Sequence, residues 1–142
     1  MIETLTIALR VAGAGLILLA LLHIPISQHL KWREDAARLA PINASIFNVH
    51  NFFICVVLVM MGLPGVLDPM MFLEKSRAAK WVTWSFAGFW AIRLYFQLFV
   101  YRADLWRGKR METCVHWWFT FIWIALTALF AVCGGMQVGW VG

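Results

Sequence analysis

The chain has 142 residues, of which 63% are hydrophobic and only 13% are charged, and its formal net charge is +5. Nine tryptophans and eleven phenylalanines exceed the usual content of a soluble domain. This composition excludes an ordinary soluble domain and predicts an all-α integral membrane protein in contact with the lipid bilayer. The positive charge does not require nucleic acid, because basic loops also contact anionic lipid headgroups, and the sequence has no nucleic-acid-binding motif.

The apolar residues form four blocks, each about as long as a helix that crosses a hydrocarbon core of roughly 30 Å. Backbone groups in lipid must be satisfied within the segment, so each block is expected to be a helix. We expect the spans at about residues 5–26, 46–67, 82–101 and 114–138. The sequence therefore predicts one domain, residues 1–142, with the fold of an up-down four-transmembrane-helix bundle with short interfacial segments.

The first connection, "SQHLKWREDAARLAPINAS", mixes apolar and charged residues and is typical of a short helix at the membrane interface. Pro41 is expected to end this helix, and Asn43 or Ser45 to cap the second span. The three cysteines, Cys55, Cys114 and Cys133, fall within or beside spans and are predicted to be packing thiols rather than disulfide partners.

Basic residues are unevenly distributed over the connections. The first and third connections carry seven: Lys31, Arg33, Arg38, Arg102, Arg107, Lys109 and Arg110. The middle connection carries three: Lys75, Arg77 and Lys80. The positive-inside rule then places the first and third connections in the cytoplasm. Both termini are expected to be extracytoplasmic, in an inner membrane of the bacterial type.

Polar side chains gather at one end of the predicted bundle. His23, His50 and His116 come from three spans and, at about 1.5 Å of rise per residue, fall at nearly one level. The third span contributes Arg93 and Gln97, which are four residues apart and so share a helix face. Such residues are costly in lipid and usually mark a functional site. His29 lies outside the spans and is expected at the interface.

The leading interpretation is a haem b site. Neutral imidazoles from two helices ligate haem iron well, and the second and fourth helices of an up-down bundle are diagonal, so His50 and His116 are the candidate axial ligands. Arg93, together with His23, would neutralise the propionates, and Gln97 would join neighbouring helices. The absence of C-x-x-C-H excludes a c-type haem. The protein would be a b-type cytochrome, or a haem-bearing anchor of a redox complex that meets quinone and a redox partner protein.

Two alternatives use the same residues. His23, His50 and His116 could bind a single Zn, Fe or Cu ion in an enzyme acting on a lipid-like substrate. No Asp or Glu lies inside a predicted span, so that enzyme would lack a carboxylate base within the membrane. The protein could instead be a structural or pigment-binding subunit, in an oligomer or a larger membrane complex.

Overall fold

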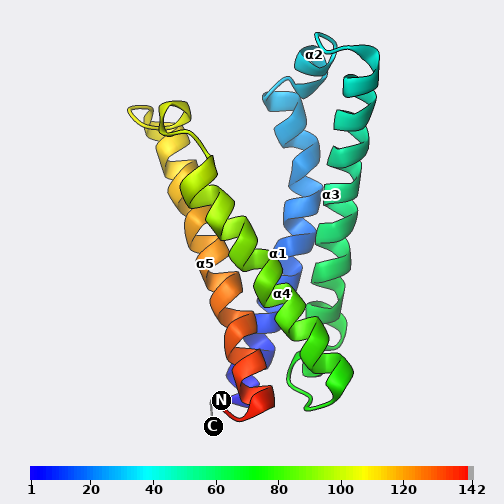
Figure 1. Ribbon diagram of the computed structural model, residues 1–142, viewed down its shortest axis with the longest axis vertical. Coiled ribbons are helices and arrows are strands. Elements are labelled where there is room, and N and C mark those ends of the chain that lie inside the picture. The colour runs from blue at the N-terminus through cyan, green and yellow to red at the C-terminus, as the bar shows by residue number, and fades with distance from the viewer. Residues whose placement is uncertain (141–142) are drawn as a thin grey trace. The chain divides into compact units, whose positions relative to one another are not determined.

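The computed structural model describes residues 1–140, except for the side chain of Leu105. That part of the chain is helical and contains no strand. The long helices are α1 (Ile2–His29), α3 (Pro41–Leu67), α4 (Arg77–Tyr95) and α5 (Arg110–Val138), and α2 (Trp32–Ala36) is short (Figure 1). Two 3-10 turns, Pro69–Phe72 and Ala103–Leu105, lie in connections, and a π-helical segment, Phe96–Val100, follows α4 directly.

Three of the four predicted spans are supported by helix length and hydropathy. Helices α1, α3 and α5 have 28, 27 and 29 residues and are apolar enough to cross a membrane. Helix α4 is shorter, with 19 residues, and carries Arg77, Lys80 and Arg93. It is not among the described helices that meet both requirements. The prediction of a helical membrane protein is thus supported, whereas the four-span bundle stays a prediction.

The chain divides into two compact units. We call Leu9–Pro69 the α1–α3 unit, and Met1–Ala8 together with Met70–Gly142 the α4–α5 unit. The first contains most of α1 with α2 and α3, and the second contains α4, the π-helical segment and α5. Each unit is described by itself below.

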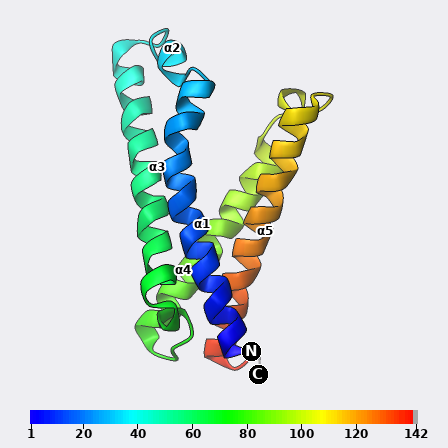
Figure 2. The same cartoon turned by 180° about the vertical axis from the view of Figure 1, so that it is seen from behind.

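Glycines bring the two long helices of the α1–α3 unit into close contact. Helices α1 and α3 run side by side and are joined through α2 (Figures 1 and 2). A Cβ atom on Gly13 would lie 2.5 Å from the Gly62 carbonyl oxygen, and one on Gly65 would lie 2.7 Å from the Leu9 carbonyl oxygen. Lipid provides no hydrophobic force between apolar helices, so small residues that allow close backbone packing are what hold them together.

The first connection contains a short helix, as predicted, but the start of α3 differs from the prediction. Helix α3 begins at Pro41 after the N-cap residue Ala40, whose side chain makes no capping bond. Asn43 and Ser45 lie inside the helix, and the Ser45 hydroxyl donates to the Pro41 carbonyl (3.0 Å). The capping prediction was wrong because proline suits the first helical turn, where its missing N–H is not needed.

Aromatic packing and one amide hold the α4–α5 unit together near the end of α5. The rings of Phe72, Phe86 and Phe130 lie within 5.1–5.3 Å of one another, centroid to centroid. The Gln137 amide donates to the Phe72 carbonyl (3.0 Å) and to the Thr83 hydroxyl (3.1 Å). These bonds satisfy polar groups buried between the two helices and the turn before α4.

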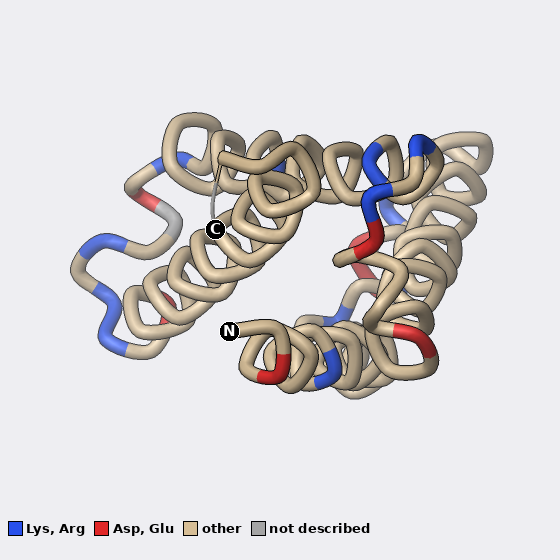
Figure 3. Tube along the Cα trace, turned by 90° about the horizontal axis from the view of Figure 1, so that it is seen from below, with Lys and Arg blue, Asp and Glu red and all other residues tan. Residues whose placement is uncertain are grey.

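Most charged residues lie at helix ends and in connections. Figure 3 shows long uncharged stretches along the helices and a run of basic residues between α4 and α5. Arg93 departs from this pattern, because it lies well inside the segment predicted as the third span.

Candidate functional site

The structure brings together three of the five side chains that the sequence singled out. Arg93 Nη1 donates to Gln97 Oε1 (3.2 Å), and Gln97 Nε2 lies 3.0 Å from His116 Nδ1. Gln97 is only 6% exposed and His116 only 9%. Three tryptophans, Trp90, Trp106 and Trp123, surround this chain of hydrogen bonds, as described below. We call these six residues the α4–α5 cluster.

The π-helical segment positions Gln97. Here the Tyr101 N–H donates to the Phe96 carbonyl (3.2 Å), five residues back, so the turn is wider than an α-helical turn. Isolated π turns of this kind are frequent at functional sites. Gln97 follows Arg93 by four residues and still reaches both Arg93 and α5, where its amide also approaches the His116 carbonyl (3.4 Å).

Arg93 determines which ring nitrogen of His116 carries the proton. A guanidinium is only a donor, so the Gln97 group beside it must be the carbonyl oxygen. The Gln97 NH2 group then faces His116 Nδ1 and donates to it. The neutral His116 ring must therefore carry its hydrogen on Nε2. In this form Nε2 is a hydrogen-bond donor rather than a lone pair for a metal.

Aromatic rings enclose the polar groups of the cluster. The Trp106 ring stacks on His116 at 4.2 Å with an interplanar angle of 9°. The Arg93 guanidinium carbon lies 4.9 Å from the Trp123 ring centroid, and Trp123 in turn stacks on Trp90 at 5.1 Å. A cation against an aromatic face is stabilised by about 2 kcal/mol or more when water is excluded. This contact favours the charged guanidinium but leaves its charge unneutralised.

The α4–α5 cluster has an excess of hydrogen-bond donors. The indole N–H groups of Trp90, Trp106 and Trp123 are buried without a partner among the described residues. Arg93 takes part in none of the ion pairs found there, which join other residues. Buried polar groups are normally paired, so these orphans require an explanation. A ligand that brings acceptors and negative charge, such as a carboxylate, would supply what these groups lack.

His23 and His50 lie in the α1–α3 unit and are in the opposite protonation form. Their Nδ1 atoms lie 2.8 Å from the Leu19 carbonyl oxygen and 2.9 Å from the Ile46 carbonyl oxygen. A carbonyl oxygen only accepts, so in the neutral ring Nδ1 carries the hydrogen and Nε2 a lone pair. This is the form in which histidine ligates a metal. His50 is exposed and His23 half-buried.

The histidines lie well inside their helices. His50 comes nine residues after Pro41, or about 14 Å along α3. His23 and His116 each lie six residues from an end of their helices, at His29 and Arg110. The helices extend beyond the apolar blocks that were used to locate the spans.

No group of three or more His, Cys, Asp or Glu side chains within the described part of the chain could hold a metal ion. The predicted three-histidine site therefore has no support there. The three cysteines are free thiols, as predicted, and Cys133 is buried as a packing residue should be, whereas Cys114 is exposed.

The tryptophans of the cluster were not among the candidate site residues that the sequence indicated. One signal was available. Trp90 and Arg93 are three residues apart, so they share a helix face. Trp106 lies in a connection, and nothing in its spacing indicated that it would stack on His116.

No family model, curated protein or solved structure matches the chain.

Proposed function

We propose that the protein binds haem in a membrane and transfers electrons, and that the α4–α5 cluster holds the carboxylates of the cofactor. The observation that carries the proposal is the excess of hydrogen-bond donors in the cluster. Its three tryptophans have unpaired indole N–H groups, and Arg93 has no acidic partner among the described residues. Haem propionates supply the missing acceptors and negative charge. When bound, haem supplies one-electron chemistry, and the protein sets its potential.

Arg93 is the residue proposed to bind a propionate. A guanidinium has five N–H donors, and only Nη1 is occupied, by Gln97. Its planar fork matches a carboxylate with two parallel hydrogen bonds. Trp123 and Gln97 hold the guanidinium in place, which reduces the entropy lost on binding.

The protonation forms of the histidines support a revised set of iron ligands. His50 and His23 present Nε2 lone pairs, whereas His116 presents an N–H group. His116 is therefore better suited to hold Gln97 and to donate to an anion. We propose His116 as a residue that supports Arg93, and we retain His50 as the candidate iron ligand that the sequence indicated.

An optical spectrum of the purified protein tests the proposal. Sharp b-type bands are expected in the reduced-minus-oxidised spectrum. A pyridine haemochrome assay should give either one or two haems per chain. Arg93→Leu should reduce haem retention about tenfold, because a charge-assisted hydrogen bond contributes about 1.5–3 kcal/mol. The matched control is Arg77→Leu, an exposed arginine in the first turn of the same helix, which should leave retention unchanged.

Other results would contradict haem binding and favour another class. A colourless protein with stoichiometric zinc, iron or copper would support an intramembrane metal enzyme. Extractable chlorophyll-type pigment would support a pigment-binding subunit.

A quinone is the second candidate ligand of the α4–α5 cluster, because its carbonyl oxygens would accept from the same indole N–H groups. A colourless protein that retains quinone, and loses it in Arg93→Leu, would identify this case. The protein would then serve as a quinone-binding subunit for a redox partner.

A further inference from the structure

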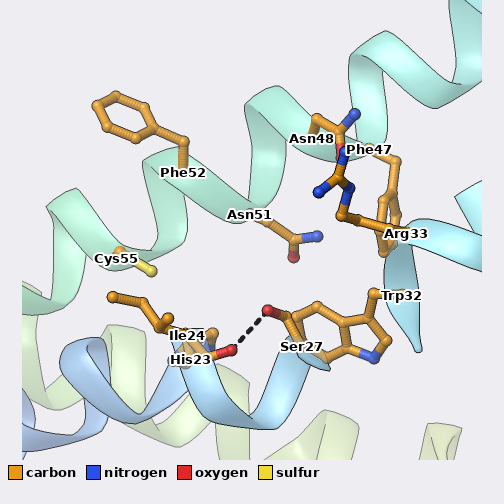
Figure 4. A pocket seen from close by; sticks show the side chains of 10 residues that line it. All are labelled: His23, Ile24, Ser27, Trp32, Arg33, Phe47, Asn48, Asn51, Phe52 and Cys55. Atoms are coloured by element: carbon orange, nitrogen blue, oxygen red, sulfur yellow. Dashed lines mark hydrogen bonds between the residues drawn. The ribbon is translucent and has the colours of Figure 1, made fainter. Parts of the chain in front are cut away.

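A pocket opens at the end of the α1–α3 unit that carries α2. Its volume is about 240 Å³, and its walls come from the last turns of α1, from α2 and from α3. Figure 4 shows Asn51 extending from α3 toward the α1 residues His23 and Ser27, with Arg33 of α2 beside the α3 residues at the mouth. None of the residues that line the pocket is acidic.

Three polar side chains of this pocket lack partners. The side chains of Arg33, Asn48 and Asn51 make no hydrogen bond or ion pair with any described residue, although the neighbouring Lys31 and Arg38 are both ion-paired. Asn51 is half-buried and lies ten residues into an apolar helix. An amide without a partner is costly in an apolar environment. One guanidinium and two amides thus offer donors, with no carboxylate in the pocket to oppose an anion.

An apolar groove continues from the pocket along the same two helices. Its volume is about 420 Å³, and it shares Ile24, Phe52 and Cys55 with the pocket. The rest of its lining is apolar: Ala20, Leu21, Val56, Val59 and Met60. The polar pocket, which we call the head site, therefore opens into an apolar groove suited to a hydrocarbon chain.

We propose that the α1–α3 unit binds a phospholipid, with the phosphate at Arg33, Asn48 and Asn51 and one acyl chain in the groove. Arginine and amide donors recognise phosphate oxygens, and the positive charge of Arg33 favours a headgroup with net negative charge. His23 Nε2 and the Ser27 oxygen remain as acceptors, because His23 Nδ1 and the Ser27 hydroxyl each bond to a backbone carbonyl. These acceptors suit the hydroxyls of a glycerol headgroup.

Aromatic contacts hold the walls of the head site. Trp32 of α2 packs edge-on against His23 (6.4 Å between centroids) and against Phe47 (6.0 Å). Trp32 therefore links α2 to both long helices, and α2 carries Arg33 to the pocket mouth. This site contains none of the six residues of the α4–α5 cluster, so Arg33→Gln and Arg93→Leu test the two proposals separately.

Native mass spectrometry of the full chain from nanodiscs tests the head site. With equal amounts of phosphatidylglycerol and phosphatidylcholine in the nanodisc, the released protein is expected to retain phosphatidylglycerol. Arg33→Gln should lower the retained fraction about tenfold, from the loss of a charge-assisted hydrogen bond. The control Arg38→Gln removes a charge from the same connection, outside the pocket, and should retain as much lipid as the parent.

The tail site is tested by filling the groove. Val59→Trp should lower retention at least as much, because Val59 lines the groove, whereas the control Val57→Trp changes an exposed neighbour that does not. Equal loss in both members of either pair would overturn the proposal, as would equal retention of the two lipids or no retained lipid. A retained neutral quinone in place of phospholipid would overturn it too. Thermal unfolding of each variant, compared with the parent, separates lost binding from lost folding.

Discussion

Gln97 shows at the scale of one residue how strongly the α4–α5 cluster depends on its hydrogen bonds. It accepts from Arg93 and donates to His116, so it connects α4 to α5. Gln97→Leu would leave both partners without their hydrogen bond, at a cost of about 1–3 kcal/mol for each buried group left unsatisfied. We expect the variant to unfold at a clearly lower temperature in detergent, as followed by tryptophan fluorescence.

Gln28→Leu provides the control for that measurement, because Gln28 is exposed near the end of α1. Its unfolding temperature should remain that of the parent. Equal midpoints for Gln97→Leu and Gln28→Leu would mean that the Arg93–Gln97–His116 chain contributes nothing to stability.

The histidines give the second prediction at this scale. If His50 ligates haem iron, His50→Ala should abolish the low-spin spectrum, because a five-coordinate iron is electronically different. His29→Ala should leave the spectrum as it is, since His29 lies at the last residue of α1. An unchanged low-spin spectrum in His50→Ala would rule out His50 as an axial ligand.

His116→Ala separates the two roles assigned to that residue. The loss of an iron ligand would remove the low-spin spectrum, whereas the loss of a support for Gln97 and Arg93 would weaken haem retention and shift the midpoint potential. The protonation form inferred from the hydrogen bonds predicts the second result. A potentiometric titration of the variant, with its spectrum recorded at each potential, distinguishes them.

At the scale of the element, the contact of α1 with α3 depends on the absence of a side chain at Gly13. A Cβ there would lie 2.5 Å from the Gly62 carbonyl oxygen and 3.0 Å from the Val66 nitrogen, and backbone atoms cannot move aside as a flexible side chain can. Gly13→Ala should therefore force the helices apart and destabilise the protein by about 1–3 kcal/mol. The midpoint of denaturation in detergent measures the loss.

Gly15 is a control on the same helix, because no atom lies within 4 Å of a Cβ placed there. Gly15→Ala should be neutral or stabilising, since alanine is a better helix former than glycine by about 1 kcal/mol. If both alanine variants behave alike, the glycine contact does not hold α1 against α3.

At the scale of the whole molecule, helix α4 decides between three spans and four. Its 19 residues include Arg93, and it does not reach the length and hydropathy of α1, α3 and α5. Single cysteines at Ser76 and Ala103, on either side of α4 and its π-helical segment, test the crossing in a variant without the three native thiols. A four-span bundle requires that a membrane-impermeant maleimide label them from opposite sides.

The same labels test orientation. The positive-inside rule predicts an extracytoplasmic cysteine at Ser76→Cys and a cytoplasmic one at Ala103→Cys, beside the basic run that follows α4. Labelling of both from one side would show that α4 does not cross the membrane. Labelling in the reverse sense would place both termini in the cytoplasm.

Composition and hydropathy alone determined the helical class, three helices long and apolar enough to cross a membrane, and the short helix α2. These properties depend on the local chain and on the cost of exposing backbone groups to lipid. The spacing of Arg93 and Gln97 likewise placed them on one helix face, and their hydrogen bond agrees with that. Helix ends were less predictable, because helices continue past the apolar residues.

Only the tertiary structure decided which residues meet across helices. The bond from Gln97 to His116, the stacking of Trp106 on His116 and the contact of Gly13 with Gly62 all join different elements. These contacts depend on how each helix is rotated about its axis and on where it crosses its neighbour. Periodicity shows which residues share a face, but apolar residues on every side of a lipid-embedded helix leave open which face meets another helix. Packing of small and aromatic side chains determines that, and in the described part of the chain it leaves the three indole N–H groups of the α4–α5 cluster without an acceptor.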